Sequence, residues 1–170
     1  MSKDIQKREK LKEKPMSFIT LVMITGFIGG IVFSSLAFLA YIFDFTSISP
    51  RVILEPWTFG DWKRGWLGTL IAIVFMGAIS IVAALIYYGL LRKFKSMWVG
   101  IAYGLALFLL VFFILNPIFP GIQPFNELNV NTLVTTLCLY VLYGLFVGYT
   151  ISYEESEISN RKTKEEEAEA

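Results

Sequence analysis

The chain has 170 residues, of which 55% are hydrophobic and 17% are charged, and its formal net charge at pH 7 is +1. Soluble domains carry about 25% charged residues, so this composition argues against an ordinary soluble domain and favours a membrane protein. The single cysteine, Cys138, excludes a disulfide within the chain, and the absence of histidine removes the commonest general base and transition-metal ligand.

Four long blocks of the sequence contain no Asp, Glu, Lys or Arg: 16–43, 65–91, 96–126 and 128–153. A helix of about 20 apolar residues crosses a hydrocarbon layer of about 30 Å, so each block can hold one spanning helix. We therefore predict an all-α polytopic membrane protein. Its four transmembrane helices form two antiparallel hairpins within residues 16–153.

A basic leader, residues 1–15, precedes the first predicted span, 18–43. Its six cations outnumber its three acids, so we expect a cytoplasmic topology signal, with binding to anionic lipid as an alternative role. The apolar run is longer than the core of about 7–15 residues in a signal peptide. We therefore expect the first span to be retained.

The first outer loop, residues 44–65, combines charged residues with tryptophans. We predict an outer-face interaction surface formed by Arg51, Glu55, Trp57, Asp61, Trp62, Lys63 and Arg64. Indole rings favour the membrane–water interface, so an aromatic anchor with incidental charges is the alternative interpretation. If the loop is a lid, Trp57 and Trp62 should pack on residues 118–125.

The second and third predicted spans, 66–91 and 97–115, flank a turn with three cations, Arg92, Lys93 and Lys95. Cations accumulate on the cytoplasmic side of membranes, so this turn orients the hairpin. Proline at position 117 ends the third span, because the residue before proline avoids helical geometry.

The second outer loop, residues 116–131, has no Lys or Arg, and the fourth span is predicted over 132–153. A tail with seven glutamates and three cations, residues 154–170, follows it. Glutamate, lysine and alanine favour helix, but the tail has nothing apolar to bury, so we expect it to be frayed or disordered alone. The leader, the 92–95 turn and the tail hold twelve of the fifteen cations, which predicts that both termini are cytoplasmic.

Three of the predicted spans carry two glycines four residues apart, which places both glycines on one helix face. Small residues let helix backbones approach closely in lipid, where there is little hydrophobic drive between helices. The predicted helix-packing residues are Gly26, Gly30, Gly100, Gly104, Gly144 and Gly148. These faces serve either packing inside the bundle or contact with a membrane partner or a second copy, and both interpretations stay open.

The predicted spans contain no Asp, Glu, Lys or Arg, and the chain has no nucleotide-binding, metal-binding or catalytic-triad motif. We therefore expect no catalytic residues, no cofactor, no metal and no nucleic-acid partner. The favoured function is a non-enzymatic structural or partner-binding membrane component, embedded in the lipid bilayer.

Two other functions remain as alternatives. A small-solute transporter or channel-like subunit would need a polar cavity between the second and fourth spans, lined by Ser80, Thr135, Thr136 and Tyr140. A lipid-head-group enzyme would use two outer-loop carboxylates, with cations holding the phosphate. Those carboxylates are Glu55 and Asp61, and the cations are Arg51, Lys63 and Arg64.

Three short stretches carry a family resemblance: PRVILEPW at 50–57, WKRGW at 62–66 and LNPIFP at 115–120. Together with the basic leader, they make the chain resemble the YqhR family of small bacterial integral membrane proteins over nearly all of its length apart from the tails. The resemblance implies a location in the bacterial plasma membrane. It carries over no functional residues.

Overall fold

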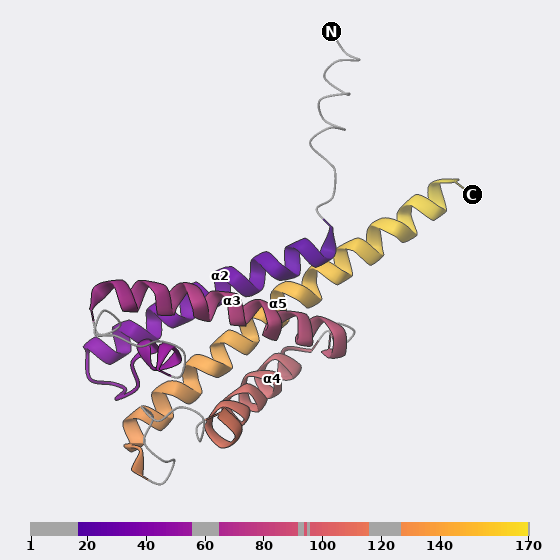
Figure 1. Cartoon of the computed structure of the whole chain (residues 1–170). Helices are drawn as coiled ribbons and strands as arrows, with labels where there is room; N and C mark the ends of the chain where they lie inside the picture. The colour runs from indigo at the N-terminus through magenta and orange to yellow at the C-terminus, as the bar shows by residue number, and fades with distance from the viewer. Residues whose placement is uncertain (1–16, 56–64, 92–93, 95, 116–126, 170) are drawn as a thin grey trace.

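A computed structural model describes residues 17–55, 65–91, 94, 96–115 and 127–169 (Figure 1). Its main elements are helices α2 (Phe18–Ile42), α3 (Trp66–Leu91), α4 (Met97–Leu109) and α5 (Val130–Glu169). A short 3-10 helix, η1 (Pro50–Leu54), lies in the first loop, and a π-helical segment, η3 (Leu110–Leu115), continues α4. The leader and the predicted contact of Trp57 and Trp62 with the second outer loop lie outside the described residues.

Four helices are long and apolar enough to cross a membrane: Phe18–Ile42, Trp66–Leu91, Met97–Leu115 and Val130–Glu157. The predicted all-α architecture with four long apolar helices is therefore confirmed. The first three segments agree with the predicted spans to within one residue. The fourth is longer at both ends than the predicted span 132–153.

The helices pack as two pairs, α2 with α3 and α4 with α5 (Figure 1). The pairs meet through α2 and α5, whereas α3 makes much less contact with α5. The start of α2 (Phe18), the end of α3 (Leu91) and the start of α4 lie on the same side of the bundle (Figure 1). We call this side the termini end. The opposite side, where η1 and the start of α5 lie, is the loop end.

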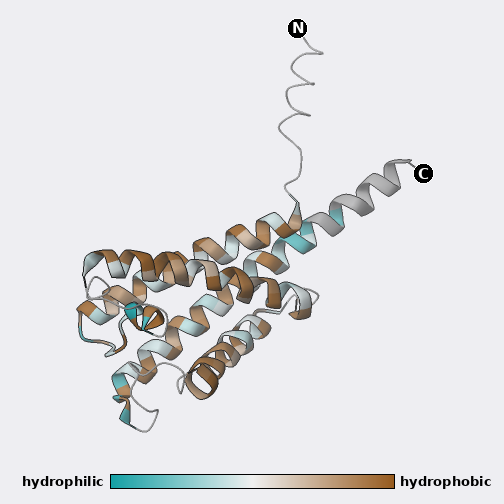
Figure 2. Ribbon diagram, viewed as in Figure 1, coloured by the Kyte–Doolittle hydropathy of each residue, from teal (hydrophilic) through white to brown (hydrophobic). Residues whose placement is uncertain are grey.

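Hydrophobic residues run along all four helices (Figure 2). Small and hydroxyl-bearing residues make up much of the inside, together with large ones such as Tyr87 and Ile151, and large aliphatic residues cover the outside. In α2, for example, the buried residues are Val22, Thr25, Gly26, Gly29, Gly30 and Ser34. Outward-facing Val74 and Val82 of α3 are more than half exposed. An apolar outside fits a surface that contacts lipid tails. Small residues inside allow the close backbone approach on which helix packing in lipid depends.

A Schellman motif ends α2 at the loop end. Asp44 adopts the left-handed conformation with φ of 58°, and its N–H donates to the carbonyl of Tyr41. The N–H of Phe45 donates to the carbonyl of Ala40 at 2.9 Å. Both bonds satisfy carbonyls that the helix end would otherwise leave without partners, and they turn the chain back toward the bundle.

Helix α5 continues without a break from Val130 to Glu169, a length of 40 residues or about 60 Å. The sequence expectation of a frayed or disordered tail therefore differs from the structure. Formation of the first turn is the costly step in making a helix, and the spanning part of α5 has already made it. Each residue of the tail therefore only has to extend an existing helix. Glutamate, lysine and alanine, which dominate the tail, are strong helix formers.

Candidate functional site

The first glycine contact joins α2 to α3 and involves Gly26 and Gly30. A Cβ atom added to Gly26 would lie 2.7 Å from the Cβ of Ala84 and 2.9 Å from the carbonyl oxygen of Ser80. A Cβ atom on Gly30 would lie 2.5 Å from the Cβ of Ser80 and 2.7 Å from the Cα of Gly77. Neither position has room for a side chain, so the two backbones meet directly along this face.

The second glycine contact joins α4 to α5. A Cβ atom on Gly144 would lie 2.5 Å from the backbone nitrogen of Gly104, and one on Gly100 would lie 3.0 Å from the carbonyl oxygen of Gly144. One on Gly148 would lie 3.0 Å from both the Cα of Gly100 and the hydroxyl of Tyr87. All six glycines singled out in the sequence thus face helices of the same chain, and both glycine contacts lie within the bundle.

Three tyrosines from three different helices form a polar cluster in the core. Tyr87 of α3, Tyr103 of α4 and Tyr143 of α5 are each less than 8% exposed. The hydroxyl of Tyr143 lies 2.5 Å from the Oγ of Ser80, and the hydroxyl of Tyr103 donates to the carbonyl oxygen of Ala83 at 2.6 Å. The rings of Tyr87 and Tyr103 meet edge to face, with centroids 5.1 Å apart.

The hydroxyls of the tyrosine cluster have partners in the bundle. The hydroxyl of Tyr87 lies 3.3 Å from the Oγ of Ser152, which itself donates to the carbonyl oxygen of Phe94. Within the part of the chain that the structure describes, no buried side-chain nitrogen or oxygen lacks a hydrogen bond. The cluster therefore links α3 to α4 and α5. The sequence signal that was missed is the tripeptide Tyr-Gly-Leu, at 103–105 and 143–145, which places each tyrosine beside a packing glycine.

The described part of the loop between α2 and α3 connects the two helix pairs at the loop end. The Oγ1 of Thr132 on α5 accepts from the backbone N–H of Ser47 at 3.0 Å. The Oγ1 of Thr135 donates to the carbonyl oxygen of Phe45 at 3.1 Å. Ile48 packs against the buried cluster of Phe108, Phe112 and Leu128. The segment 44–55 is thereby attached to α5 and to the end of α4.

Arg51 attaches the same segment to the other helix pair. Its Nε donates to the Oγ1 of Thr69 on α3 at 2.6 Å, and its guanidinium lies 6.0 Å from the ring centroid of Phe38 on α2. The Oγ of Ser49 caps η1 by accepting from the N–H of Arg51. Arg51, a member of the predicted outer-face surface, is partly buried and contacts both α2 and α3.

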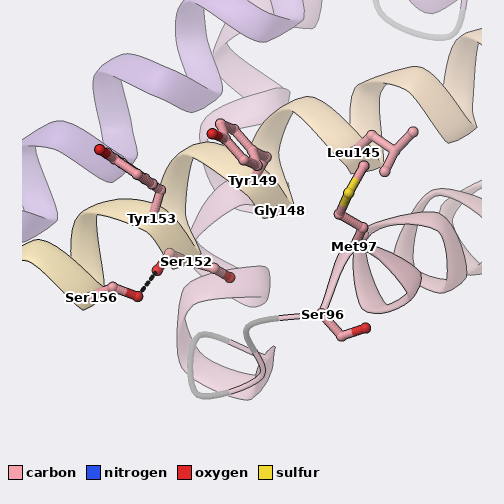
Figure 3. A pocket seen from close by; sticks show the side chains of 9 residues that line it. Ser96, Met97, Leu145, Gly148, Tyr149, Ser152, Tyr153 and Ser156 are labelled. Atoms are coloured by element: carbon pink, nitrogen blue, oxygen red, sulfur yellow. Dashed lines mark hydrogen bonds between the residues drawn. The ribbon is translucent and has the colours of Figure 1, made fainter.

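A groove of about 140 Å³ lies at the termini end, between the start of α4 and the middle of α5 (Figure 3). Gly100 and Gly148, whose backbones meet closely, lie at its floor. Its walls are formed by Ser96, Met97, Gly100, Leu145, Gly148, Tyr149, Ser152, Tyr153 and Ser156. The sequence did not point to this groove, although the two glycines in its floor were singled out for packing.

The family can now be assigned. A model described as "Conserved membrane protein YqhR" matches residues 2–166 of the chain. The chain belongs to the YqhR family. It is also 50% identical over 163 residues to the "Uncharacterized protein YqhR" of Bacillus subtilis (strain 168), which covers 94% of this chain and 92% of that protein. No solved structure matches the chain.

Membership of the YqhR family confirms the resemblance drawn from the three sequence stretches and the leader. It also agrees with the four candidate spans, so the chain is a membrane protein. Neither finding tells which side of the membrane holds the termini. The cytoplasmic assignment of both ends stays a prediction from the distribution of the cations.

In this YqhR-family chain, the predicted outer-face surface is described only in part. Arg51 makes the contacts given above, and Glu55 is half-buried at the end of η1. The other predicted members, Trp57, Asp61, Trp62, Lys63 and Arg64, lie outside the described residues. Of the two carboxylates that the lipid-head-group enzyme would use, Glu55 and Asp61, the structure therefore describes only Glu55.

The residues predicted to line a polar cavity are distributed over separate contacts. Ser80 pairs with Tyr143, Thr135 bonds to Phe45, and Thr136 donates to the carbonyl of Thr132 at 2.6 Å. The ring of Tyr140 packs edge to face on Phe108, with centroids 6.1 Å apart. The partner of Ser80 is eight residues beyond Thr135 on α5, or about 12 Å along the helix. These side chains do not converge on one cavity.

Residues that commonly carry chemistry are sparse in the described parts of the bundle. No group of three or more His, Cys, Asp or Glu residues that could hold a metal ion occurs among the residues the structure describes. Cys138 is exposed on α5, at a depth where its neighbours along the helix are apolar. Most of the polar groups described above bond to one another or to backbone carbonyls, which favours a structural role for them.

Proposed function

We propose that this YqhR-family protein is a non-enzymatic membrane component that binds a protein partner through the charged extension of α5. The observation that carries the proposal is the continuity of α5, which is one helix from Val130 to Glu169 although the candidate membrane span within it ends at Glu157. The remaining twelve residues, 158–169, add about 18 Å of helix. In Figure 1 this part projects past the other helices.

The tip of the extension, which follows the cations Arg161, Lys162 and Lys164, favours a basic protein surface as its partner. The last five helical residues, 165–169, include four glutamates. The inner leaflet of a bacterial membrane is anionic, so an acidic helix tip next to it is repelled from the lipid. The tip is thereby available to a basic segment of another protein.

The described part of the bundle offers little support for a catalytic role. Its glycine faces are used in contacts between its own helices, and the tyrosine cluster has internal hydrogen-bond partners. Arg51, the cation proposed to hold a lipid phosphate, is bonded to Thr69 and lies over Phe38. The transport alternative is less well supported, because Ser80, Thr135 and Thr136 each have a separate partner.

Both termini are assigned to the cytoplasm in this proposal. The start of α2 and the extension of α5 lie at the same end of the bundle (Figure 1). The sequence places twelve of its fifteen cations in segments at that end, which is the distribution expected for a cytoplasmic side. A bacterial plasma-membrane protein with this topology presents the acidic tip to cytoplasmic proteins.

Site-specific photocrosslinking in native membranes tests the proposal. A photoreactive residue at Ala168 should give a protein adduct, and the same residue at lipid-facing Leu142 should give none. Changing Glu165, Glu166 and Glu167 to Lys should abolish the adduct at position 168, since the reversal removes the acidic tip. An adduct of twice the chain mass would instead identify a second copy as partner. Absence of any protein adduct at position 168, or an adduct unaffected by the charge reversal, would refute the proposal.

A further inference from the structure

The groove between α4 and α5 changes from apolar to polar along the direction of the helices (Figure 3). Met97, Leu145 and the ring of Tyr149 form its apolar walls. Its other end holds the hydroxyls of Ser152 and Ser156. The charge-free block of α5 ends between these two serines, so the polar end of the groove lies at the depth of the lipid head groups.

The two serine hydroxyls at the polar end can accept hydrogen bonds but have already donated their protons. The Oγ of Ser156 donates to the carbonyl oxygen of Ser152 at 2.9 Å (Figure 3), and the Oγ of Ser152 donates to the carbonyl oxygen of Phe94 at 3.2 Å. A hydroxyl oxygen has two lone pairs, so each serine keeps at least one, even though Ser152 also pairs with Tyr87. The polar end therefore suits a ligand that donates hydrogen bonds, such as an ammonium, and not a phosphate.

Acidic and aromatic residues of α5 strengthen the preference for a cation. Glu155 follows Ser152 by three residues and Glu157 follows Tyr153 by four, so each glutamate neighbours a groove residue on the helix surface. The rings of Tyr149 and Tyr153 are stacked with centroids 5.8 Å apart, and both side chains are more than half exposed. The face of a tyrosine ring attracts a cation placed over it. Carboxylates, rings and acceptor oxygens thus favour the same kind of ligand.

We propose that this groove binds the ammonium group of phosphatidylethanolamine from the surrounding bilayer, with the ammonium beside Ser156 and an acyl chain along the apolar walls. The chain is a membrane protein, so lipid is present at this depth. The groove volume of about 140 Å³ is close to the roughly 150 Å³ of a cavity that holds benzene, so it accommodates the ethylammonium group and a few methylene groups. The cations Arg92, Lys93 and Lys95 precede α4 in the sequence, so the ammonium is assigned to the α5 side of the groove and the phosphate to the other.

Native mass spectrometry of the full chain tests the choice of head group. The protein, purified in detergent, is offered equal amounts of phosphatidylethanolamine, phosphatidylcholine and phosphatidylglycerol with identical acyl chains. Retention should fall in that order, because the choline nitrogen keeps its charge but has no N–H to donate, and phosphatidylglycerol has no cation. Retention of phosphatidylcholine or phosphatidylglycerol equal to or above that of phosphatidylethanolamine would overturn the proposal.

Two adjacent glutamates provide a matched pair of variants with the same change in net charge. Glu155→Gln should lower retention of phosphatidylethanolamine about fivefold, because it removes one opposite charge near the ammonium. Glu154 lies about 160° around α5 from Ser156, so Glu154→Gln should change retention less than about twofold. Ser156→Ala should reduce the preference for phosphatidylethanolamine over phosphatidylcholine, because it removes an acceptor that only the primary amine uses. Circular dichroism confirms that each variant is folded. Equal losses in the two glutamate variants, or an unchanged preference in Ser156→Ala, would overturn the site.

Discussion

Gly104→Ala adds one methyl group at the closest approach of α4 and α5. The new Cβ would clash with the carbonyl oxygen of Tyr140. It would also lie 2.7 Å from the Cα of Val141 and 2.9 Å from the carbonyl carbon of Tyr140. These are backbone atoms, which cannot move aside as the end of a flexible side chain can. To reach an ordinary contact of about 3.4 Å from Val141, the helices must separate by roughly 0.7 Å.

A separation of this size affects the whole contact, because Gly100 and Gly144 meet along the same face. A gap of about 0.5–1 Å forfeits a quarter to a half of each close dispersion contact. Overpacking of a tight core costs about 1–3 kcal/mol, and we expect a loss near the upper end of that range for Gly104→Ala.

Gly89→Ala is the matched control, since nothing lies within 4 Å of a Cβ atom at that position. Alanine is a better helix former than glycine, so this variant should be neutral or slightly stabilising. Thermal or denaturant unfolding of both variants in the same detergent measures the difference. Equal stability of Gly104→Ala and Gly89→Ala would show that α4 and α5 do not meet at these glycines.

Two further substitutions test the polar contacts. Tyr143→Phe and Ser80→Ala should each lower the free energy of unfolding by about 0.6–1.7 kcal/mol, the range for side-chain hydrogen bonds between spanning helices. The double variant should lose less than the sum, and strict additivity in the cycle would show that the two hydroxyls are not coupled. Arg51→Lys should loosen segment 44–55 nearly as much as Arg51→Ala, because lysine lacks the Nε that bonds Thr69 and the planar group over Phe38. Faster proteolysis or amide exchange of that segment measures the effect, and full protection in the lysine variant would contradict it.

The span boundaries were predictable because exclusion of charge from lipid acts on every residue of a span. Each charge-free block therefore predicts one helix, and the predicted spans 66–91 and 97–115 coincide with those of the structure. The glycine pairs were predictable as close-contact faces for a similar reason, since spacing alone puts Gly26 and Gly30 on one side of a helix. Which helix each pair meets depends on three-dimensional arrangement, so the sequence leaves both internal and external partners open.

The polar contacts were harder to foresee. Tyr103 and Tyr143 are aromatic residues in apolar runs, and their hydropathy does not reveal that their hydroxyls reach Ala83 and Ser80 on another helix. Arg51 is predicted to belong to an interaction surface of its loop, and its charge alone does not reveal that its aliphatic stem and planar group pack over Phe38. The continuation of α5 was underestimated because the tail was judged as an isolated peptide, without the membrane helix that precedes it.

The arrangement in two pairs has a consequence for biosynthesis. Every atom of the first glycine contact comes from residues before Leu91, whereas the second contact joins α4 to α5, with Tyr87 of α3 against Gly148. The first hairpin can therefore close in the bilayer while the ribosome is still making the second, in keeping with the N-terminal-first order of domain folding. The contacts of Tyr143 with Ser80 and of Thr132 with Ser47 must wait for the final helix. Emergence of that helix therefore both completes the second pair and joins it to the first.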